Sequence, residues 1–150
     1  MNVVDANVLL YAVNADASRH AESKAWLDGA LRGGATVGFA WVAVLAFVRL
    51  ATKAAVFPHP LATDEAFDVV DAWLSQPAAI VVEPTARHGQ LVRSLLAGAG
   101  TGGNLVNDAH LAALSIEHRG SVISYDSDFG RLPGVTWRQP EPRPDRPVLQ

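Results

Sequence analysis

Apolar residues occur along the chain in short runs that alternate with longer stretches of amphipathic pattern. The short runs, which predict buried strands, cover residues 2–4, 36–40, 79–82 and 121–125. The longer stretches predict helices over residues 7–13, 18–31, 41–52, 63–75, 88–97 and 108–118. Alternation of strand and helix favours right-handed crossovers. We therefore expect an α/β fold with three layers, in which helices cover both faces of a mostly parallel sheet.

Proline changes this pattern near the end of the chain. Four of the nine prolines lie at positions 140, 142, 144 and 147, among charged residues. Segments of this composition are extended or mobile rather than packed. We expect one domain over residues 1–140 and a proline-rich tail over residues 141–150.

Composition narrows the class of protein. An apolar content of 49% with 18% charged residues in 150 is typical of one compact domain, and the absence of cysteine excludes disulfides and cysteine metal sites. The longest run without a polar side chain, residues 37–48, is shorter than the roughly 18 residues of a membrane span. Because no basic stretch precedes an apolar one at the N-terminus, we expect a cytoplasmic protein that makes no membrane contact.

Three aspartates directly follow predicted strands. Asp5 follows the first strand, and Asp126 and Asp128 follow the last. Open parallel sheets bind ligands at the carboxyl ends of their strands. Asp108, at the start of a predicted helix, could reach the same edge, so that four carboxylates would converge there.

Converging carboxylates are unfavourable unless they are protonated, paired with cations or neutralised by a metal. Oxygen ligands select Mg²⁺ or Mn²⁺, which polarise phosphoryl oxygens and activate water, so the matching chemistry is hydrolysis of a phosphodiester. Each aspartate also has a local interpretation that stays open. Asp5 and Asp108 could cap the helices that follow them, and Asp126 and Asp128 could form a turn.

Three separated motifs carry the pattern of a known family. They are Val4-Asp5-Ala6-Asn7, Gly103-Asn104-Leu105-Val106-Asn107-Asp108-Ala109-His110-Leu111-Ala112-Ala113 and Ser124-Tyr125-Asp126-Ser127-Asp128-Phe129. Together with Phe47-Val48-Arg49 and Trp73, they resemble the PIN domain of VapC-type toxins over nearly the whole chain to about Pro140. The resemblance implies a Mg²⁺-dependent ribonuclease of a type II toxin–antitoxin system, for which Mn²⁺ would substitute. It also implies a homodimer that a VapB-type antitoxin binds.

At the matching positions, the resemblance implies that Asp5, Asp108 and Asp126 are metal ligands, and that Asp128 is a further catalytic acid. Asn7 is expected to support the site as a polar group. Ser124, two residues before Asp126, is expected to hydrogen-bond a ligand carboxylate and to orient it.

A net charge of −3 argues against a uniformly basic nucleic-acid binder, but ten arginines and two lysines could still form a local cationic rim. The cations nearest to the motifs in the sequence are Arg49, Lys53, Arg119 and Arg131. Of these, we expect Arg49 to bind RNA phosphates, which would make binding sensitive to salt.

One position departs from the pattern of the family. The family usually has a glutamate just before the Phe-Val-Arg segment, where this chain has Ala46, and no acid lies between Asp28 and Asp64. We expect a weaker metal site, or one ion in place of two, with Asp128 as the compensating acid. The alternative is a PIN-like protein that binds RNA or its antitoxin without cleaving RNA. Retention of the other acids favours the enzyme, because a purely structural crevice gains stability when apolar residues replace converging carboxylates.

Other α/β classes match less well. A haloacid-dehalogenase-like phosphatase has a second aspartate two residues after the first, where this chain has Asn7. A receiver module needs a mid-chain aspartate and a late lysine, whereas both lysines here come early. The glycines of residues 98–103 match the dinucleotide-binding pattern G-x-G-x-x-G, but they follow a helix rather than a strand, so we interpret them as a flexible loop.

The remaining side chains give weaker signals. Tyr11, Trp26 and Phe39 could bury an antitoxin segment, form a dimer contact or pack in the core. The histidines show no metal-binding spacing and are interpreted as structural or exposed. Glu22 and Glu117 are interpreted as solvated acids on polar helix faces.

Overall fold

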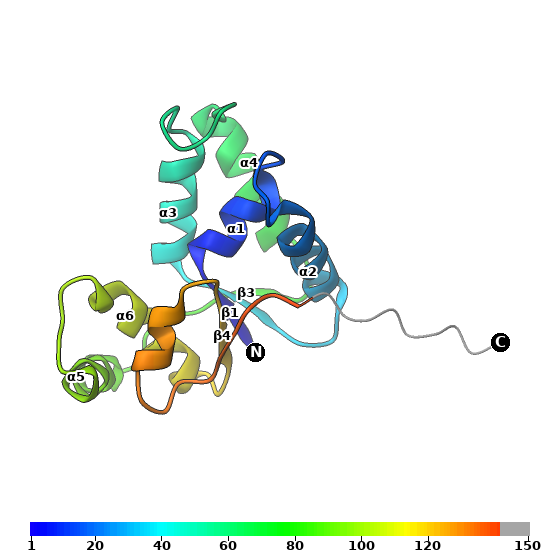
Figure 1. Cartoon of the computed structure of the whole chain (residues 1–150). Coiled ribbons are helices and arrows are strands. Elements are labelled where there is room, and N and C mark those ends of the chain that lie inside the picture. Colours follow the sequence, from blue (N-terminus) through cyan, green and yellow to red (C-terminus); the bar gives the residue numbers. More distant parts are fainter. Residues whose placement is uncertain (142–150) are drawn as a thin grey trace.

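A five-stranded sheet between two layers of helices forms the part of the chain that the computed structural model describes, residues 1–141 (Figure 1). The strands are β1 (Asn2–Val4), β2 (Val37–Phe39), β3 (Ala79–Val81), β4 (Ser121–Ile123) and β5 (Trp137–Arg138). They lie in the order β3-β2-β1-β4-β5, and each neighbouring pair is parallel. The predicted three-layer α/β fold is confirmed.

The helices divide between the two faces of the sheet. They are α1 (Ala6–Val13), α2 (His20–Arg32), α3 (Trp41–Ala51), α4 (Thr63–Leu74), α5 (His88–Ala99), α6 (Leu105–Glu117) and the 3₁₀ helix η1 (Ser127–Arg131). Successive strand residues point to opposite faces. Val4 and Ile123 accordingly pack in a core with α1 to α4, whereas Val3 and Val122 pack in a second core with α5 and α6.

The structure changes two of the predicted boundaries and adds one strand. Helix α6 begins at Leu105, because Leu105 is itself buried in the core and anchors an additional turn, so Asp108 does not open the helix. Helix α5 continues to Ala99 and ends where Gly100 adopts a left-handed conformation with φ of 76°. Strand β5 was not predicted, because a pair of residues is too short to show a periodic pattern.

The order of the strands places a topological switch point between β1 and β4. The connections from β1 to β3 run over one face of the sheet, and the connection from β3 to β4 runs over the other. At such a point, open parallel sheets bind ligands in the crevice outside the carboxyl ends of the strands. Asp5 lies at this point, where its backbone N–H donates to the carbonyl of Ile123 at 3.0 Å.

Two further expectations concern the whole chain. The predicted tail over residues 141–150 lies outside the described residues, apart from Glu141. Within residues 1–141, no helix is both long enough and apolar enough to cross a membrane. The apolar run over residues 37–48 is divided between β2 and α3.

Candidate active site

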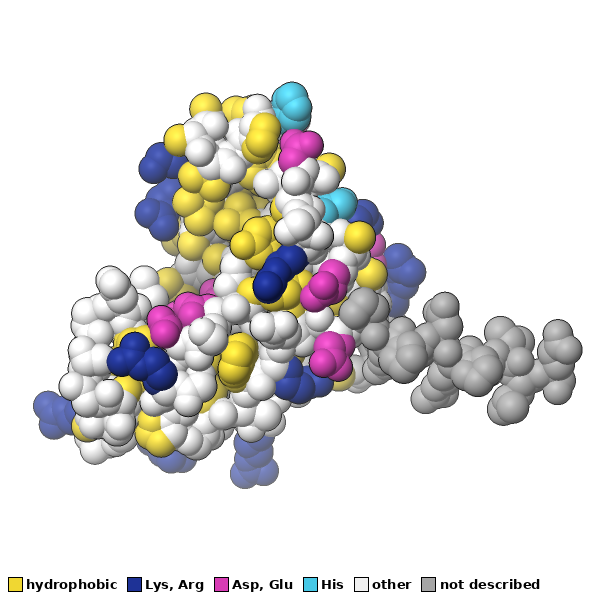
Figure 2. Space-filling model, viewed as in Figure 1, with side chains coloured by type: hydrophobic (Ala, Val, Ile, Leu, Met, Phe, Trp, Pro, Cys, Tyr) yellow, Lys and Arg dark blue, Asp and Glu magenta, His cyan; other side chains and the backbone are white. Residues whose placement is uncertain are grey.

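Three carboxylates meet near the topological switch point. Asp108 lies in the first turn of α6, Asp126 precedes η1, and Asp128 lies within η1. One carboxylate oxygen of each lies within 4.8 Å of the others. Figure 2 shows acidic side chains on the side of the molecule where α6 and η1 face the beginnings of α1 and α3.

Asp5 completes this acidic group from β1, although it is not one of the three residues with oxygens within 4.8 Å. Burial raises the pKa of Asp5, the hydrogen bonds from Ser124 and Ala6 act against this rise, and the charge of Asp126 adds to it. The net result is a pKa above the ordinary value. The charge of Asp126 therefore disfavours the ionised form of Asp5.

Ser124 and Asn7 hold Asp5 in place. The Ser124 hydroxyl donates to Asp5 Oδ2 at 2.7 Å, and it accepts from the Asp126 N–H and from Asn7 Nδ2, each at 3.0 Å. Asn7 Oδ1 accepts from the backbone N–H of Tyr125 at 3.2 Å. Ser124 was expected to hydrogen-bond a ligand carboxylate, and the carboxylate that it contacts is that of Asp5.

Asp108 has the most perturbed pKa of the group. Burial raises its pKa first, and the charges of Asp126 and Asp5, a hydrogen bond with Asp126 and the charge of Asp128 raise it further, to about 7. Helix capping does not explain its position, because no side chain caps α6. A carboxyl group with a raised pKa among other acids is typical of a site that binds a cation.

The local contacts expected for Asp5 and Asp126 are present, in addition to the place of these aspartates in the acidic group. Asp5 Oδ1 accepts from the Ala6 N–H at 2.7 Å at the start of α1, and Asp126 Oδ1 accepts from the Asp128 N–H at 2.9 Å at the start of η1. Each carboxylate has a second oxygen. Capping therefore fixes the orientation of these side chains without consuming their capacity to bind a cation.

This donor set fits a hard divalent cation. All four groups are carboxylates, and carboxylate oxygens are the ligands that Mg²⁺ and Mn²⁺ prefer. No acid from α3 joins them, because residues 41–51 contain neither aspartate nor glutamate. The position of the expected family glutamate is Ala46, which is half-buried.

Arg131 and Arg49, two of the cations that lie nearest to the motifs in the sequence, have different surroundings. Arg131 Nη1 lies 3.8 Å from Asp128 Oδ1, and both side chains are about half exposed, so this pair adjoins the acidic group directly. Arg49 is exposed in the last turn of α3 and forms no ion pair with any residue that the structure describes.

The sequence analysis missed a network of hydrogen-bonded polar side chains. Glu117 is not solvated: its side chain is 1% exposed, and it accepts from the Thr85 N–H at 2.9 Å, from the Thr85 hydroxyl and from His88 Nδ1 at 2.7 Å. His88 Nε2 in turn lies 2.7 Å from His110 Nδ1. No sequence signal identifies this network, because the residues that hydrogen-bond each other are separated by 22 to 32 positions in the sequence.

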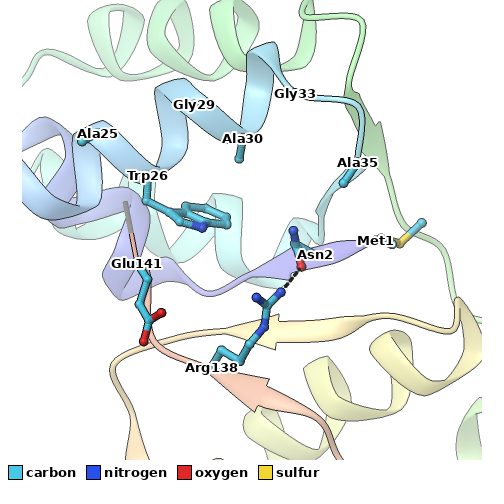
Figure 3. Close-up of a pocket in the computed structure, with 10 residues that line it drawn as sticks. All are labelled: Met1, Asn2, Ala25, Trp26, Gly29, Ala30, Gly33, Ala35, Arg138 and Glu141. Carbon is cyan, nitrogen blue, oxygen red and sulfur yellow. Dashed lines mark hydrogen bonds between the residues drawn. The ribbon is translucent and has the colours of Figure 1, made fainter. Parts of the chain in front are cut away.

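A hollow of about 670 Å³ lies elsewhere, between α2 and strands β1 and β5 (Figure 3). Trp26 and Arg138 line it, and Arg138 Nη2 donates to Asn2 Oδ1 at 2.9 Å. None of the aspartates of the acidic group lines this hollow, so it is separate from the candidate active site.

The aromatic residues that the sequence nominated for protein contacts have other surroundings. Phe39 is 1% exposed and stacks on Trp73 with ring centroids 6.1 Å apart, so it belongs to the core. Tyr11 packs edge-on against Tyr125, with ring centroids 5.5 Å apart. Trp26 lines the hollow described above.

Comparison with known proteins supports the same family. A model of the PIN domain matches residues 3–135. The chain is 59% identical over 140 residues to Ribonuclease VapC37 of Mycobacterium tuberculosis, covering 93% of this chain and 97% of that protein. It is 36% identical over 140 residues to Ribonuclease VapC33 of the same species, covering 93% and 98%.

Solved structures share the fold at lower identity. VapC20 of Mycobacterium tuberculosis, a sarcin-ricin loop cleaving toxin, aligns with a TM-score of 0.68 at 18% identity and covers 93% of this chain and 100% of that one. VapBC2 from Rickettsia felis, bound to a DNA fragment from its promoter, aligns with a TM-score of 0.63 at 16% identity and covers 92% and 97%. The fold, the matched residues and the identity to curated relatives together show that the chain belongs to the PIN domain family, among the VapC ribonucleases.

Proposed function

We propose that this protein is the toxin of a type II toxin–antitoxin pair and that it hydrolyses RNA phosphodiester bonds with Mg²⁺, or with Mn²⁺ in its place. The observation that carries the proposal is the meeting of Asp108, Asp126 and Asp128 at the crevice between β1 and β4. The names of its relatives, which are ribonucleases, support the choice of RNA as substrate. RNA and antitoxin would meet the protein in the cytoplasm, which we propose as its location.

Each residue of the site has a distinct role in this proposal. Asp5, Asp108 and Asp126 hold the cation, and Asp128 contributes a further carboxylate. When bound, the cation polarises a phosphoryl oxygen and lowers the pKa of water. Ser124 and Asn7 fix the Asp5 carboxylate through hydrogen bonds, so that its orientation is set before the cation arrives. Arg49 is proposed to bind RNA phosphates.

The deciding experiment measures RNA cleavage by protein purified without antitoxin. Wild type should cleave RNA with Mg²⁺ or Mn²⁺ and stop when a chelator is added. Asp108→Asn should lose about 100-fold or more of the activity, because it removes a ligand charge rather than a supporting contact. Asp71→Asn makes the same chemical change on the exposed face of α4 and should cleave as wild type does.

Asp108→Asn also controls for a contaminating ribonuclease, because a contaminant present in every preparation would cleave RNA in this variant as well. Activity that persists in Asp108→Asn at the level of Asp71→Asn would reject the proposed site. Absence of cleavage in wild type, with metal bound and varied RNAs supplied, would reject the enzymatic function itself.

Ala46 supports a second candidate, a PIN-like protein that binds RNA or antitoxin without cleaving RNA. The missing glutamate removes one carboxylate from the acidic group, so a single ion is expected in place of two. A calorimetric titration with Mn²⁺ that finds two tight sites would contradict this expectation. RNA binding without cleavage in the experiment above would favour the second candidate.

We also propose two protein partners, a VapB-type antitoxin and a second copy of this chain. Structural neighbours include VapBC complexes from Rickettsia felis and Salmonella typhimurium. Trp41 and Leu45 lie one turn apart on α3 and are 45% and 52% exposed, which gives this helix an apolar surface suited to protein contact. Light scattering at two protein concentrations would reveal a dimer, and a constant monomer mass would reject the homodimer.

A further inference from the structure

Tyr125 lies between two residues of the acidic site, but its side chain points away from them. Its backbone N–H donates to Asn7 within the site, whereas its hydroxyl contacts α2. There it hydrogen-bonds the buried Ser23 Oγ at 2.9 Å and donates to Glu22 Oε1 at 3.0 Å. With Tyr11 edge-on against the ring, the aromatic side chain is fixed from three sides.

Arg19 lies over the face of this fixed ring. Its Cζ atom is 4.2 Å from the centroid of the Tyr125 ring, a distance typical of a cation–π contact. Arg19 is exposed and, among residues 1–141, is in no ion pair. Because Arg19 is exposed, N–H donors of its guanidinium remain accessible to a ligand from solvent.

The surroundings of Arg19 favour an anion rather than a base. Arg19 is also the N-cap residue of α2, a helix of 13 residues that no side chain caps, so the positive end of its dipole lies at the same place, where Glu22 of the first turn offsets part of it. One face of the Tyr125 ring is already covered by Arg19, and Tyr11 packs edge-on against the ring, so the ring gives a nucleobase little room to stack.

Arginines therefore contact side chains at both ends of the segment 125–128, which carries Asp126 and Asp128. Arg19 is held by Tyr125, the residue before Asp126, and Arg131 is held by Asp128. In a chain of net charge −3, the acids of the site repel an RNA backbone unless cations border them. Figure 2 shows basic side chains on either side of the acidic ones on this face.

We infer that Arg19, supported by the Tyr125 ring, binds a phosphate of single-stranded RNA next to the phosphodiester that is cleaved. This inference rests on the proposed ribonuclease function and adds a substrate-binding residue to it. Arg131 adjoins the acids on the other side, so the strand would run past Tyr125, across the acidic group and toward η1.

The test compares Arg19→Ala with Arg32→Ala. Both remove one positive charge from an exposed arginine of the same helix, but at 1.5 Å per residue the two positions are about 20 Å apart. Arg19→Ala should raise the KM for a short single-stranded RNA about tenfold, as expected for the loss of a charged hydrogen bond, and leave kcat within twofold. Arg32→Ala should leave both values unchanged, and Arg19→Lys should recover part of the loss.

Salt dependence provides a readout that a structural role would not change. The slope of log(kcat/KM) against log[salt] should decrease by about 0.7 in Arg19→Ala, the value for one lost phosphate contact to a single strand, and stay constant in Arg32→Ala. Equal effects of the two variants, or a lower kcat at unchanged KM and unchanged slope in Arg19→Ala, would overturn the inference while the ribonuclease function stands. Failure of the wild type to cleave or bind any RNA would overturn both.

Discussion

Ser124 uses its whole hydrogen-bonding capacity inside the acidic site. A hydroxyl has one donor and two acceptor positions, and here the donor serves Asp5 while the acceptors serve Asp126 and Asn7. One small buried side chain thus joins β1, α1 and the segment that follows β4. Its removal should disturb the orientation of Asp5 more than the stability of the fold.

Ser124→Ala should weaken the binding of divalent cations about 10- to 100-fold, the usual effect of removing a partner of a metal ligand. Calorimetric titration with Mn²⁺ measures this directly. Ser115→Ala is a matched control, because Ser115 is equally buried but its hydroxyl donates only to the Ala112 carbonyl within α6. Equal Mn²⁺ affinities in the two variants would show that Ser124 does not orient the site.

At this scale, the sequence predicts the residues whose chemistry depends on their place after a strand. Asp5 and Asp126 follow predicted strands, and the order of the strands brings them together, whereas a contact of Ser124 with a carboxylate was expected only from the resemblance to the family. The Arg19–Tyr125 contact could not be predicted, because it joins a helix end to a strand end 106 positions away and has no periodic signature. Glu117 occupies a position that looks polar and solvated, and only the packing of α5 on α6 buries it.

Helices α5 and α6 are joined by a polar contact as well as by apolar packing. Burial acts to raise the pKa of Glu117, but the hydrogen bonds from Thr85 and His88 outweigh it, so the pKa lies below its ordinary value. The charged form of Glu117 is therefore favoured by folding. This link fixes the helix that presents Asp108 against its neighbour.

Glu117→Ala should destabilise the protein by about 1–3 kcal/mol, because it removes the charged acceptor of the hydrogen bonds from Thr85 and His88. In a domain of this size, each kcal/mol lowers Tm by about 2–4 °C in thermal denaturation. Asp71→Ala removes an exposed helical acid and should change stability by less than about 0.5 kcal/mol. A Tm for Glu117→Ala equal to that of Asp71→Ala would contradict this role.

Most helices and strands were predictable because apolar residues recur in them at regular intervals. The differences between the predicted and observed elements lie at their ends. The structure starts α6 three residues before the predicted start, since a buried leucine outweighs the local preference of aspartate for the first position. The short strand β5 exists only because Trp137 Nε1 donates to the Ser124 carbonyl at 2.9 Å and β4 offers an edge for pairing. Neither cause is visible in a local window of sequence.

The acidic group affects the stability of the whole molecule through pH. The pKa of Asp108 is about 7 in the folded protein against an ordinary 3.8, so between these values the folded state binds more protons than the unfolded state. The contribution of this group to the free energy of unfolding therefore falls as pH rises from 3.8 to about 7 and then levels off. Burial is the largest cause of the raised pKa of Asp108, and a bound cation would offset both this cause and the repulsion from the neighbouring acids.

With a chelator present, the Tm of wild type should fall relative to that of Asp108→Asn as pH rises across this range. Added Mn²⁺ should raise the Tm of wild type at pH 8 and have little effect at pH 4, where Asp108 is largely protonated. Thermal denaturation of both proteins, with and without Mn²⁺, measures these differences. A constant Tm difference between wild type and Asp108→Asn at all pH values would contradict the raised pKa.

The acidic site draws its residues from both ends of the chain. Asp5 directly follows the first strand, whereas Asp126 and Asp128 follow the fourth, and β5 pairs beside them through Trp137 and Arg138. Synthesis proceeds from the N-terminal side, so a nascent or prematurely terminated product that stops before residue 126 holds Asp5, or Asp5 and Asp108, without the other two acids. If the acidic group is the cleaving centre that we propose, such a partial product leaves the messenger RNA under translation intact.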